Sequence, residues 1–287
     1  MCKVNYKIHQ PASQHEPLRE KMVMKIWAVA NQKGGVGKTT TAVSLAGVLH
    51  NRHARVLLVD LDPHGSLTSY FGADPDNIEQ SGYDLFLQTQ EVYAVIRKTK
   101  FENLDYIPAS SALATLDRQL GAKGGMGLVI KKALDQVSAK YDYALLDCPP
   151  MLGLLMVNAL AACERLLIPV QTEFLALKGL ERMVHTLDMI QKSRKQNITQ
   201  TIVPTFFDQR LKASNETLQI LRSTYTETIW NGLIPIDTQF RDASRLGIPL
   251  TIERPSCRGS RAYSNLLDFL LGETSVEHAI TEGGLEL

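Results

Sequence analysis

The chain has 287 residues, of which 44% are apolar, and this is enough to bury one large core. It carries 31 Lys and Arg against 30 Asp and Glu, so any contact with a nucleic acid must come from a local patch of charge. The composition excludes a disordered chain and a disulfide scaffold, and four scattered cysteines without a CxxC pair predict a reduced compartment without structural zinc or iron–sulfur sites.

The residue pattern divides the chain into three parts. Residues 1–23 mix charged and polar residues without an apolar run, so they predict a poorly ordered amino-terminal extension and not a signal peptide. Residues 24–271 carry the pattern of one folded domain. The tail at 272–287 holds four glutamates and no Lys or Arg, which argues against a membrane anchor because anionic lipid repels it.

Short apolar runs bounded by turns alternate with helical periods along the domain. Buried strands are expected at 25–31, 55–60, 104–108, 143–147 and 165–169, with weaker candidates at 201–204 and 229–234. Helices are expected at 39–50, 125–140 and 214–225, and between the strands at 143–147 and 165–169. Such alternation is typical of a parallel sheet. The predicted fold class is therefore α/β, a single doubly wound and mostly parallel sheet flanked by helices.

The first strand and the first helix enclose a glycine-rich loop, Lys33-Gly-Gly-Val-Gly-Lys-Thr-Thr40. Glycines let the backbone amides turn inward, and the helix start adds partial positive charge, so such a loop cradles phosphates. Lys38 is expected to pair with the β- and γ-phosphates, and Thr39 to place its hydroxyl on Mg²⁺. The candidates for nucleotide binding are the loop residues Gly34, Gly35, Val36, Gly37, Lys38, Thr39 and Thr40.

The loop departs from the general pattern G-x-x-x-x-G-K-[ST], because Gln32 stands at the first glycine and a second lysine, Lys33, follows it. In this form it resembles the deviant Walker A ATPases of the ParA/MinD type, and most closely the Soj-like ParA branch. The resemblance covers residues 25–271 and implies the P-loop NTPase fold, with ATP and Mg²⁺ as cofactors. It also implies a homodimer in the ATP-bound state, in which Lys33 reaches the phosphates of the partner. Lys33 and Lys38 are therefore catalytic candidates.

Two other predicted strands end in carboxylates, in Asp60-Leu-Asp-Pro-His64 and in Leu145-Leu-Asp-Cys-Pro-Pro150. Carboxylates at strand ends beside a phosphate loop suit the water shell of Mg²⁺ and the positioning of an attacking water. Simple capping of the strand end is the alternative for the first pair.

The family resemblance assigns roles to these carboxylates. It implies that Asp62 orients the hydrolytic water and is a catalytic candidate. It implies a metal site for Mg²⁺ made by Thr39 with Asp60 and Asp147, the two carboxylates binding through water. His64 replaces the glutamine that is usual in the family.

Three later segments resemble family motifs that surround the nucleotide. Residues 167–174 resemble a strand end, residues 203–210 the segment that borders the adenine, and residues 234–241 the loop that closes over the base and ribose. From the last segment, Pro235 and Asp237 are the candidates for nucleotide contact.

Residues 205–262 contain eight Lys and Arg against six acids, and seven of the eight are Arg, which suits bidentate contact with phosphate. In this respect the segment resembles ParA dimers, which use scattered Lys and Arg near the carboxyl terminus for sequence-independent DNA binding. Ordinary surface charge is the alternative. The DNA-binding candidates are Arg210, Lys212, Arg222, Arg241 and Arg245.

The resemblance implies an ATP-dependent dimerisation switch with slow hydrolysis that binds double-stranded DNA nonspecifically. An adaptor protein would stimulate it, and its cargo would be a plasmid, a chromosome origin or a protein cluster such as a chemosensory array. The expected location is the cytoplasm, on the nucleoid where DNA is bound. The alternatives are a MinD-like membrane-cycling regulator, a metabolic or assembly ATPase of the same superfamily, and a nucleotide-binding scaffold without hydrolysis.

Overall fold

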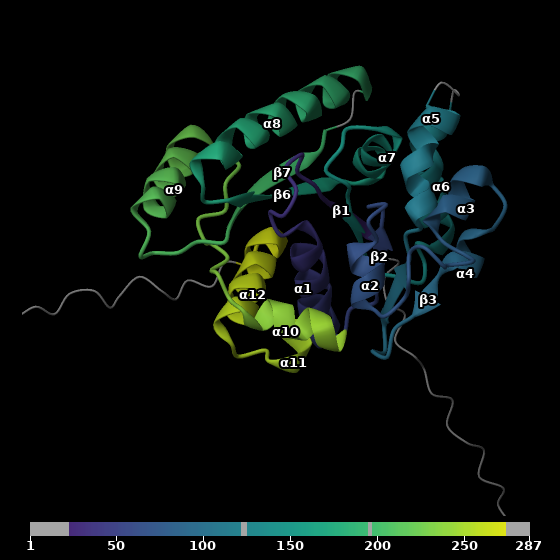
Figure 1. The fold of residues 1–287 in the computed structure, drawn as a ribbon, viewed down its shortest axis with the longest axis horizontal. Coiled ribbons are helices and arrows are strands. Elements are labelled where there is room, and N and C mark those ends of the chain that lie inside the picture. The colour runs from purple at the N-terminus through teal and green to yellow at the C-terminus, as the bar shows by residue number, and fades with distance from the viewer. Residues whose placement is uncertain (1–22, 122–124, 195–196, 274–287) are drawn as a thin grey trace, which may run out of the picture.

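The computed structural model describes residues 23–121, 125–194 and 197–273, in which one sheet lies between two layers of helices (Figure 1). The predicted extension and tail lie outside the described residues, except for Val23, Gly272 and Glu273. No helix in the described ranges is long and apolar enough to cross a membrane.

In the described part of the chain, seven strands form the sheet in the order β3-β4-β2-β5-β1-β6-β7. They are β1 (Lys25–Val29), β2 (Val56–Asp60), β3 (Arg97–Lys98), β4 (Leu104–Ile107), β5 (Tyr143–Asp147), β6 (Arg165–Gln171) and β7 (Thr199–Thr205). Neighbouring strands pair in parallel, except that β3 is antiparallel to β4 at the edge. The predicted fold class is confirmed, and the parallel strands all end at one edge of the sheet.

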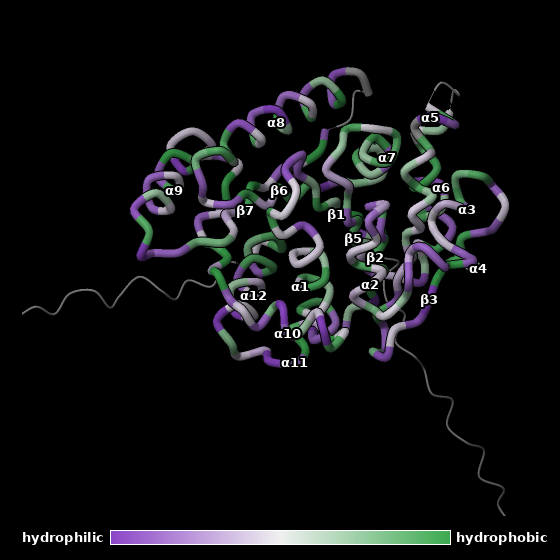
Figure 2. The backbone as a smooth tube through the Cα atoms, in the orientation of Figure 1, coloured by the Kyte–Doolittle hydropathy of each residue, from purple (hydrophilic) through white to green (hydrophobic). Residues whose placement is uncertain are grey.

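The parallel strands are buried on both faces, which explains their continuous apolar runs. In β1, Trp27 and Val29 belong to the core on one face, and Ile26 and Ala28 to the core on the other. Figure 2 shows hydrophobic residues concentrated on the strands and on α7 (Leu154–Ala162), whereas hydrophobic and hydrophilic residues alternate along α8 (Phe174–Arg194). The alternation along α8 is typical of a helix that packs by one side.

Each face of the sheet has its own layer of helices (Figure 1). One layer contains α1 (Lys38–Asn51), α2 (Ser66–Tyr70), α10 (Gln239–Leu246), α11 (Leu250–Glu253) and α12 (Arg258–Leu271). The other contains α3 (Gly82–Leu87), α4 (Val92–Val95), α5 (Leu116–Leu120), α6 (Val129–Val137), α7, α8 and α9 (Lys212–Thr224), with short 3-10 helices at Ser111–Thr115 and Met126–Leu128.

Residues 229–234 do not form the strand that was predicted there. They run beside β7, with Trp230 N donating to Ile202 O at 2.9 Å and Ile234 N donating to Pro204 O at 2.8 Å. Pro204 has no N–H to donate between these two bonds, so the ladder breaks and isolated bridges remain. The prediction of a strand was wrong because a proline of the neighbouring strand decides the pairing.

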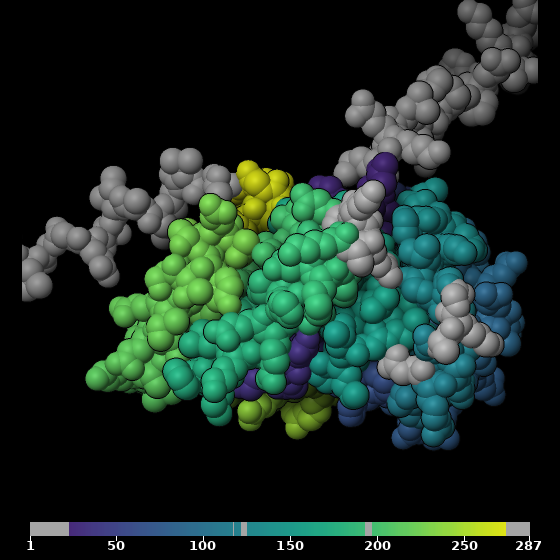
Figure 3. Space-filling view, turned by 90° about the horizontal axis from the view of Figure 1, so that it is seen from above, coloured from purple at the N-terminus to yellow at the C-terminus, as the bar shows by residue number. Residues whose placement is uncertain are grey.

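β1 carries the chain from one edge of the molecule to the other. Figure 3 shows purple residues from the start of the described chain at the upper edge and again at the lower edge, between teal and green segments. The strand begins at the first of these places, and the loop that follows it reaches the surface at the second. This loop opens the functional site.

Candidate functional site

The loops after β1, β2, β6 and β7 open into a cavity of about 910 Å³. The first turns of α1, the helix α2 and residues 234–241 complete its walls. In the sheet, β1 and β6 are neighbours, and the chain leaves β1 toward β2 on one side and leaves β6 toward β7 on the other, so the two connections run in opposite directions. Open α/β sheets bind ligands outside the carboxyl ends of their strands at such a position.

Residues 31–37, between β1 and α1, form an open backbone cradle at one end of this cavity. Gly35 and Gly37 have φ angles of 73° and 92°, which glycine adopts without strain. A Cβ at Gly34 or Gly35 would meet no atom within 4 Å, so the space over the loop is free. α1 begins at Lys38, and the first N–H groups of a helix lack partners within it and carry partial positive charge. The cradle fits the phosphates of a nucleotide.

The cradle is held in place from the sheet side. Val36 is fully buried, and its carbonyl accepts a hydrogen bond of 3.0 Å from Thr205 Oγ1. Asn31 donates to Pro169 O at 2.8 Å and accepts from Lys33 N at 2.9 Å. These bonds join the loop to the ends of β6 and β7, so its shape does not depend on a ligand.

The first three residues of α1, Lys38, Thr39 and Thr40, lie beside the cradle. The Lys38 side chain is buried, and its Nζ donates a long hydrogen bond of 3.4 Å to Lys33 O, across the cradle. Thr40 lines the cavity beside Thr39. Of the seven predicted loop residues, Gly35, Gly37, Thr39 and Thr40 line the cavity, whereas Val36 and Lys38 are buried beside it.

Asp147, at the end of β5, holds a buried oxygen without a partner. Its Oδ2 accepts a hydrogen bond of 2.6 Å from Thr39 Oγ1, whereas its Oδ1 has no hydrogen-bond partner among the described residues. Burial, followed by the nearby charge of Asp60, raises the pKa of the Asp147 carboxyl well above its usual range. An orphaned oxygen of this kind, next to a threonine hydroxyl, fits a hard divalent cation such as Mg²⁺.

Asp60 lies opposite Asp147 in the β2–β5 register and is also fully buried. Its Oδ2 accepts hydrogen bonds from Thr68 N at 2.8 Å and Thr68 Oγ1 at 2.7 Å, and its Oδ1 accepts from Asp62 N at 3.1 Å. Burial raises the pKa of Asp60 to about 7, against the effect of these bonds. Its carboxylate is fixed in the wall, which suits a role through water and not direct ligation.

The described residues contain no cluster of three or more His, Cys, Asp or Glu that would form a metal cage.

Asp62 and His64 form a tight turn at the rim of the cavity. Asp62 Oδ1 accepts hydrogen bonds from His64 N at 3.1 Å and from the His64 ring, whose Nδ1 is 2.8 Å away. The His64 side chain is 80% exposed, and that of Asp62 is 13% exposed. The histidine at the family's glutamine position thus contacts the carboxylate that was predicted to orient water.

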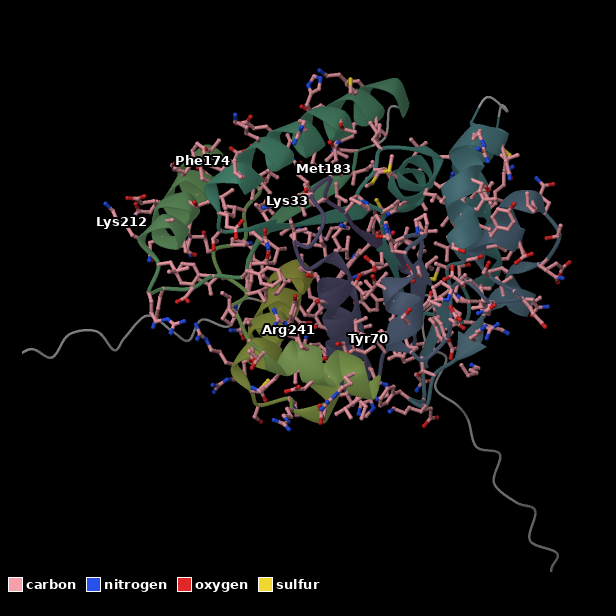
Figure 4. The ribbon with its side chains drawn as sticks, in the orientation of Figure 1. Lys33, Tyr70, Phe174, Met183, Lys212 and Arg241 are labelled. Atoms are coloured by element: carbon pink, nitrogen blue, oxygen red, sulfur yellow. The ribbon has the colours of Figure 1, made fainter. Side chains whose placement is uncertain are left out.

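Lys33 lies on the outer rim of the loop and contacts its own chain. Its Nζ is 2.9 Å from Gln171 Oε1 and 3.2 Å from Glu173 Oε2, and its side chain is 29% exposed. Gln171 also donates from Nε2 to Gly35 O at 3.2 Å. Figure 4 shows Lys33 beside α8, between Phe174 and Met183, and a Cβ at Gly179 of this helix would lie 3.7 Å from Lys33 Cβ. The sequence did not reveal this contact, since no local pattern links residues that are 138 positions apart.

Phe206 and residues 234–238 also line the cavity, and the Phe206 ring lies against the phosphate loop, since a Cβ at Gly37 would come within 3.4 Å of it. Phe206 has a φ of 52°, unusual for a bulky side chain, and is 41% exposed. Pro235 forms part of this wall, whereas Asp237 accepts hydrogen bonds from Gln239 N at 3.0 Å and Gly259 N at 3.2 Å. Asp237 therefore also ties α10 to α12. The sequence carries no signal for the backbone conformation of Phe206.

The five predicted DNA contacts do not form one patch. Arg210 holds Asp208 at 2.9 and 2.7 Å, which lowers the pKa of that carboxyl to about 2, and Lys212 lies 3.5 Å from Glu216. Arg222 donates to Asn231 O, in the segment that runs beside β7. Arg241 and Arg245 lie on α10, and Figure 4 shows Arg241 well away from Lys212.

Comparison with known sequences identifies relatives over most of the chain. The family model for the AAA domain matches residues 24–200. The chain is 37% identical over 243 residues to the sporulation initiation inhibitor protein Soj of Bacillus subtilis, covering 84% of this chain and 96% of Soj. It is 33% identical over 242 residues to the chromosome partitioning protein ParA of Myxococcus xanthus, covering 84% of this chain and 86% of that protein.

Solved structures share the fold. Cobyrinic acid a,c-diamide synthase of Mycobacterium smegmatis, with a bound ATP analogue and magnesium, is 33% identical with a TM-score of 0.76, over 87% of this chain and 94% of that chain. A putative plasmid partition protein of Borrelia burgdorferi bound to AMPPNP is 24% identical with a TM-score of 0.75, over 88% and 100% of the two chains.

Proposed function

This chain belongs to the ParA/Soj family of P-loop ATPases, and we propose that it works as an ATP-dependent dimerisation switch. It is an ATPase with ATP and Mg²⁺ as cofactors, as in the related structures that contain them. In the proposed cycle, ATP joins two copies, the dimer binds double-stranded DNA nonspecifically, and slow hydrolysis releases it.

The position of Lys33 carries this proposal. Lys38 occupies the buried wall of the cradle, and Lys33 holds a second ammonium group on the outer rim. Its partners there are the amide of Gln171 and the exposed carboxylate of Glu173, and an ion pair at the surface contributes about 0–1 kcal/mol. The phosphate oxygens of a nucleotide bound to a second copy would therefore displace these partners at small cost in free energy.

The surface around the loop suits a second copy as well. Met151, Phe174 and Leu175 follow the ends of β5 and β6 on either side of β1, and they are 74%, 65% and 71% exposed. Exposed apolar side chains in one region mark interaction sites. A partner seated over the loop would bury them.

Within each site, the proposed roles follow the geometry. Lys38 would bind the β- and γ-phosphates, and Thr39, Asp60 and Asp147 would hold the Mg²⁺ shell. The ion, when bound, neutralises charge on the phosphate oxygens. Asp62 would orient the attacking water, with His64 holding its carboxylate. Since positioning and electrostatics dominate phosphoryl transfer, a slow intrinsic rate is expected.

The switch would act in the cytoplasm, on the nucleoid while it is bound to DNA. An adaptor protein would stimulate hydrolysis and link the switch to a cargo, which is a plasmid, a chromosome origin or a protein cluster. The partitioning roles named for Soj and ParA relatives support this part of the proposal.

Size-exclusion chromatography with light scattering tests the dimerisation step. Wild type, Lys33→Ala and Asp62→Ala are compared with ATP, with ADP and without nucleotide, and Lys131→Ala on α6 serves as a control for lost charge. Asp62→Ala should remain dimeric in ATP, and Lys33→Ala should stay monomeric and inactive. If all proteins bind a fluorescent ATP analogue but remain monomers, the dimerisation switch is wrong. If Asp62→Ala hydrolyses ATP at the wild-type rate, the role of Asp62 is wrong.

A further inference from the structure

A second cavity, of about 590 Å³, lies at the opposite edge of the sheet from the nucleotide site. Its walls are Arg55 before β2, the turn at 98–103 between β3 and β4, and residues 139–141 before β5. We call it the amino-edge hollow. The charged residues in its walls are the cations Arg55, Lys98, Lys100 and Lys140 and the acids Glu102 and Asp105.

Two of the four cations already have carboxylate partners. Arg55 lies 2.7 Å from Asp142, and Lys98 lies 2.7 Å from Asp105. Lys100 and Lys140 make no salt bridge with any described residue.

The ammonium groups of these two lysines lie against aromatic rings. Lys140 Nζ is 4.3 Å from the ring centroid of Tyr93, and Lys100 Nζ is 5.5 Å from that of Phe101. A ring stabilises a cation without neutralising it. Both ammonium groups therefore keep a full charge for an external anion.

The turn that carries Lys100 is rigid. Thr99 Oγ1 donates to Leu104 O at 2.6 Å and accepts from Phe101 N at 3.1 Å. Asn103 has a φ of 62°, and its carbonyl accepts a hydrogen bond of 2.8 Å from Val56 N, at the start of β2. A rigid turn holds its lysine in place before any ligand arrives, which lowers the entropy lost on binding.

Lys100 also connects the hollow to α10. Its Nζ donates to Leu246 O at 3.4 Å, at the carboxyl end of that helix. Arg241 and Arg245 are four residues apart on α10 and so lie on the same side of it, and Arg241 lines the nucleotide cavity. Figure 1 shows α10 along the edge of the molecule between α12 and α2. We call Arg241, Arg245, Lys100 and Lys140 the basic strip.

We propose that the basic strip binds the phosphate backbone of double-stranded DNA, with the amino-edge hollow as its far end. The inference rests on the proposed DNA-binding function and names its surface. The cations are exposed and spread along a surface, and the Lys98 side chain beside them is 82% exposed. A small anion needs donors that converge on one point, whereas a polyanion is held by separate cations that release its counterions.

The strip differs from the set of cations chosen from the sequence. It keeps Arg241 and Arg245 and adds two lysines from segments far away in the sequence. It leaves out Arg210 and Lys212, which have carboxylate partners in their own chain, and Arg222, which donates to Asn231 O. Each phosphate contact contributes about 0.9 to the slope of log K against log salt, or about 8-fold in affinity at roughly 0.1 M salt. Losing Lys100 and Lys140 together should therefore weaken binding by up to about 60-fold.

Fluorescence anisotropy with a labelled random-sequence duplex, in ATP at several salt concentrations, tests the proposal. Wild type is compared with Lys100→Ala/Lys140→Ala and with a matched control, Lys131→Ala/Lys132→Ala, which removes two exposed lysines from α6. The first pair should lower the salt slope by about 1.8 and weaken binding, and the control pair should change neither. Basal ATP hydrolysis should be the same in all three proteins, which shows that each is folded.

The other outcomes separate the possible failures. If the wild type binds duplex in ATP and both double variants bind equally well, the strip is wrong and DNA binding stands. If the wild type binds no duplex in ATP, the proposed DNA-binding function fails and the strip fails with it. If Lys100→Ala/Lys140→Ala loses affinity for inorganic tripolyphosphate but not for duplex, the hollow is a small-anion site and its assignment to DNA is wrong.

Discussion

Replacing Asp147 with asparagine should stabilise the nucleotide-free protein while it abolishes Mg²⁺-dependent hydrolysis. Asp147 and Asp60 are buried opposite each other at the ends of β5 and β2, and Asp147 Oδ1 has no hydrogen-bond partner among the described residues. The side chain of asparagine has nearly the same shape and can still accept the hydrogen bond from Thr39. It removes one of two neighbouring buried charges.

The burial of the two carboxyls sets the size of the change in the free energy of unfolding, and the direction of their pKa shifts sets how it depends on pH. Burial raises the pKa of Asp60 to about 7 and that of Asp147 well above its usual range. The folded state therefore holds protons that the unfolded chain releases above about pH 4, so the stability of the empty protein falls as pH rises toward the folded pKa values. Removing a poorly satisfied buried charge should raise the free energy of unfolding by about 1–3 kcal/mol at roughly pH 8.

Thermal unfolding of wild type and Asp147→Asn, without nucleotide and at a series of pH values, measures this. Each kcal/mol should shift Tm by roughly 2–4 °C in a domain of this size. The difference between the two proteins should shrink as pH falls, because the raised pKa of Asp147 lets the wild-type carboxyl take up a proton and lose its charge. With ATP and Mg²⁺, the wild type alone should gain metal-dependent stability. If Asp147→Asn is less stable than wild type at every pH, the carboxylate is not a destabilising element of the empty site, and the reasoning is wrong.

Three further changes test other contacts. Glu173→Gln should weaken the hold on Lys33 and tighten ATP-dependent dimerisation by up to about 30-fold, because each of the two copies breaks an ion pair of at most about 1 kcal/mol. Light scattering over a dilution series measures it, and looser dimers would contradict it. Thr68→Val should lower the free energy of unfolding by about 2–4 kcal/mol in urea titration, because Asp60 Oδ2 loses one donor and Ala109 N its acceptor. Phe206→Gly should raise it by about 0.5–1 kcal/mol by relieving the left-handed backbone, and a clear loss of stability would mean that ring packing outweighs the strain.

The parts of the fold and site that could be predicted from the sequence are those with local signals. Strands buried on both faces produce unbroken apolar runs, so β1, β2, β5 and β6 were found within a residue or two at most of their ends. The phosphate loop was found because its glycines and its lysine must be adjacent in sequence to surround one anion. Asp60 and Asp147 were singled out because each directly follows an apolar run, and the carboxyl ends of parallel strands meet at one edge. Asp62, two residues after Asp60, was singled out by the family resemblance.

The parts that were missed depend on contacts between distant segments. The strand expected at 229–234 is broken by a proline in β7, and only the pairing of the two segments reveals this. The contact of Lys33 with Gln171 links residues that are 138 positions apart. The cations of residues 205–262 were treated as one group because they are close in sequence. In the structure, however, Arg210 forms an ion pair with Asp208, whereas Arg241 lines the nucleotide cavity.

The amide of Gln171 has a consequence for how the empty protein meets its ligand. Its oxygen holds Lys33 and its nitrogen holds the carbonyl of Gly35, so one side chain at the end of β6 fixes both the charge and the glycine turn of the loop. Glycines would otherwise sample many conformations, and ordering each residue costs about 1–2 kcal/mol of entropy. Part of this ordering is already complete in the folded chain. The nucleotide then meets a receptor whose shape was set during folding, and more of its interaction energy remains as affinity.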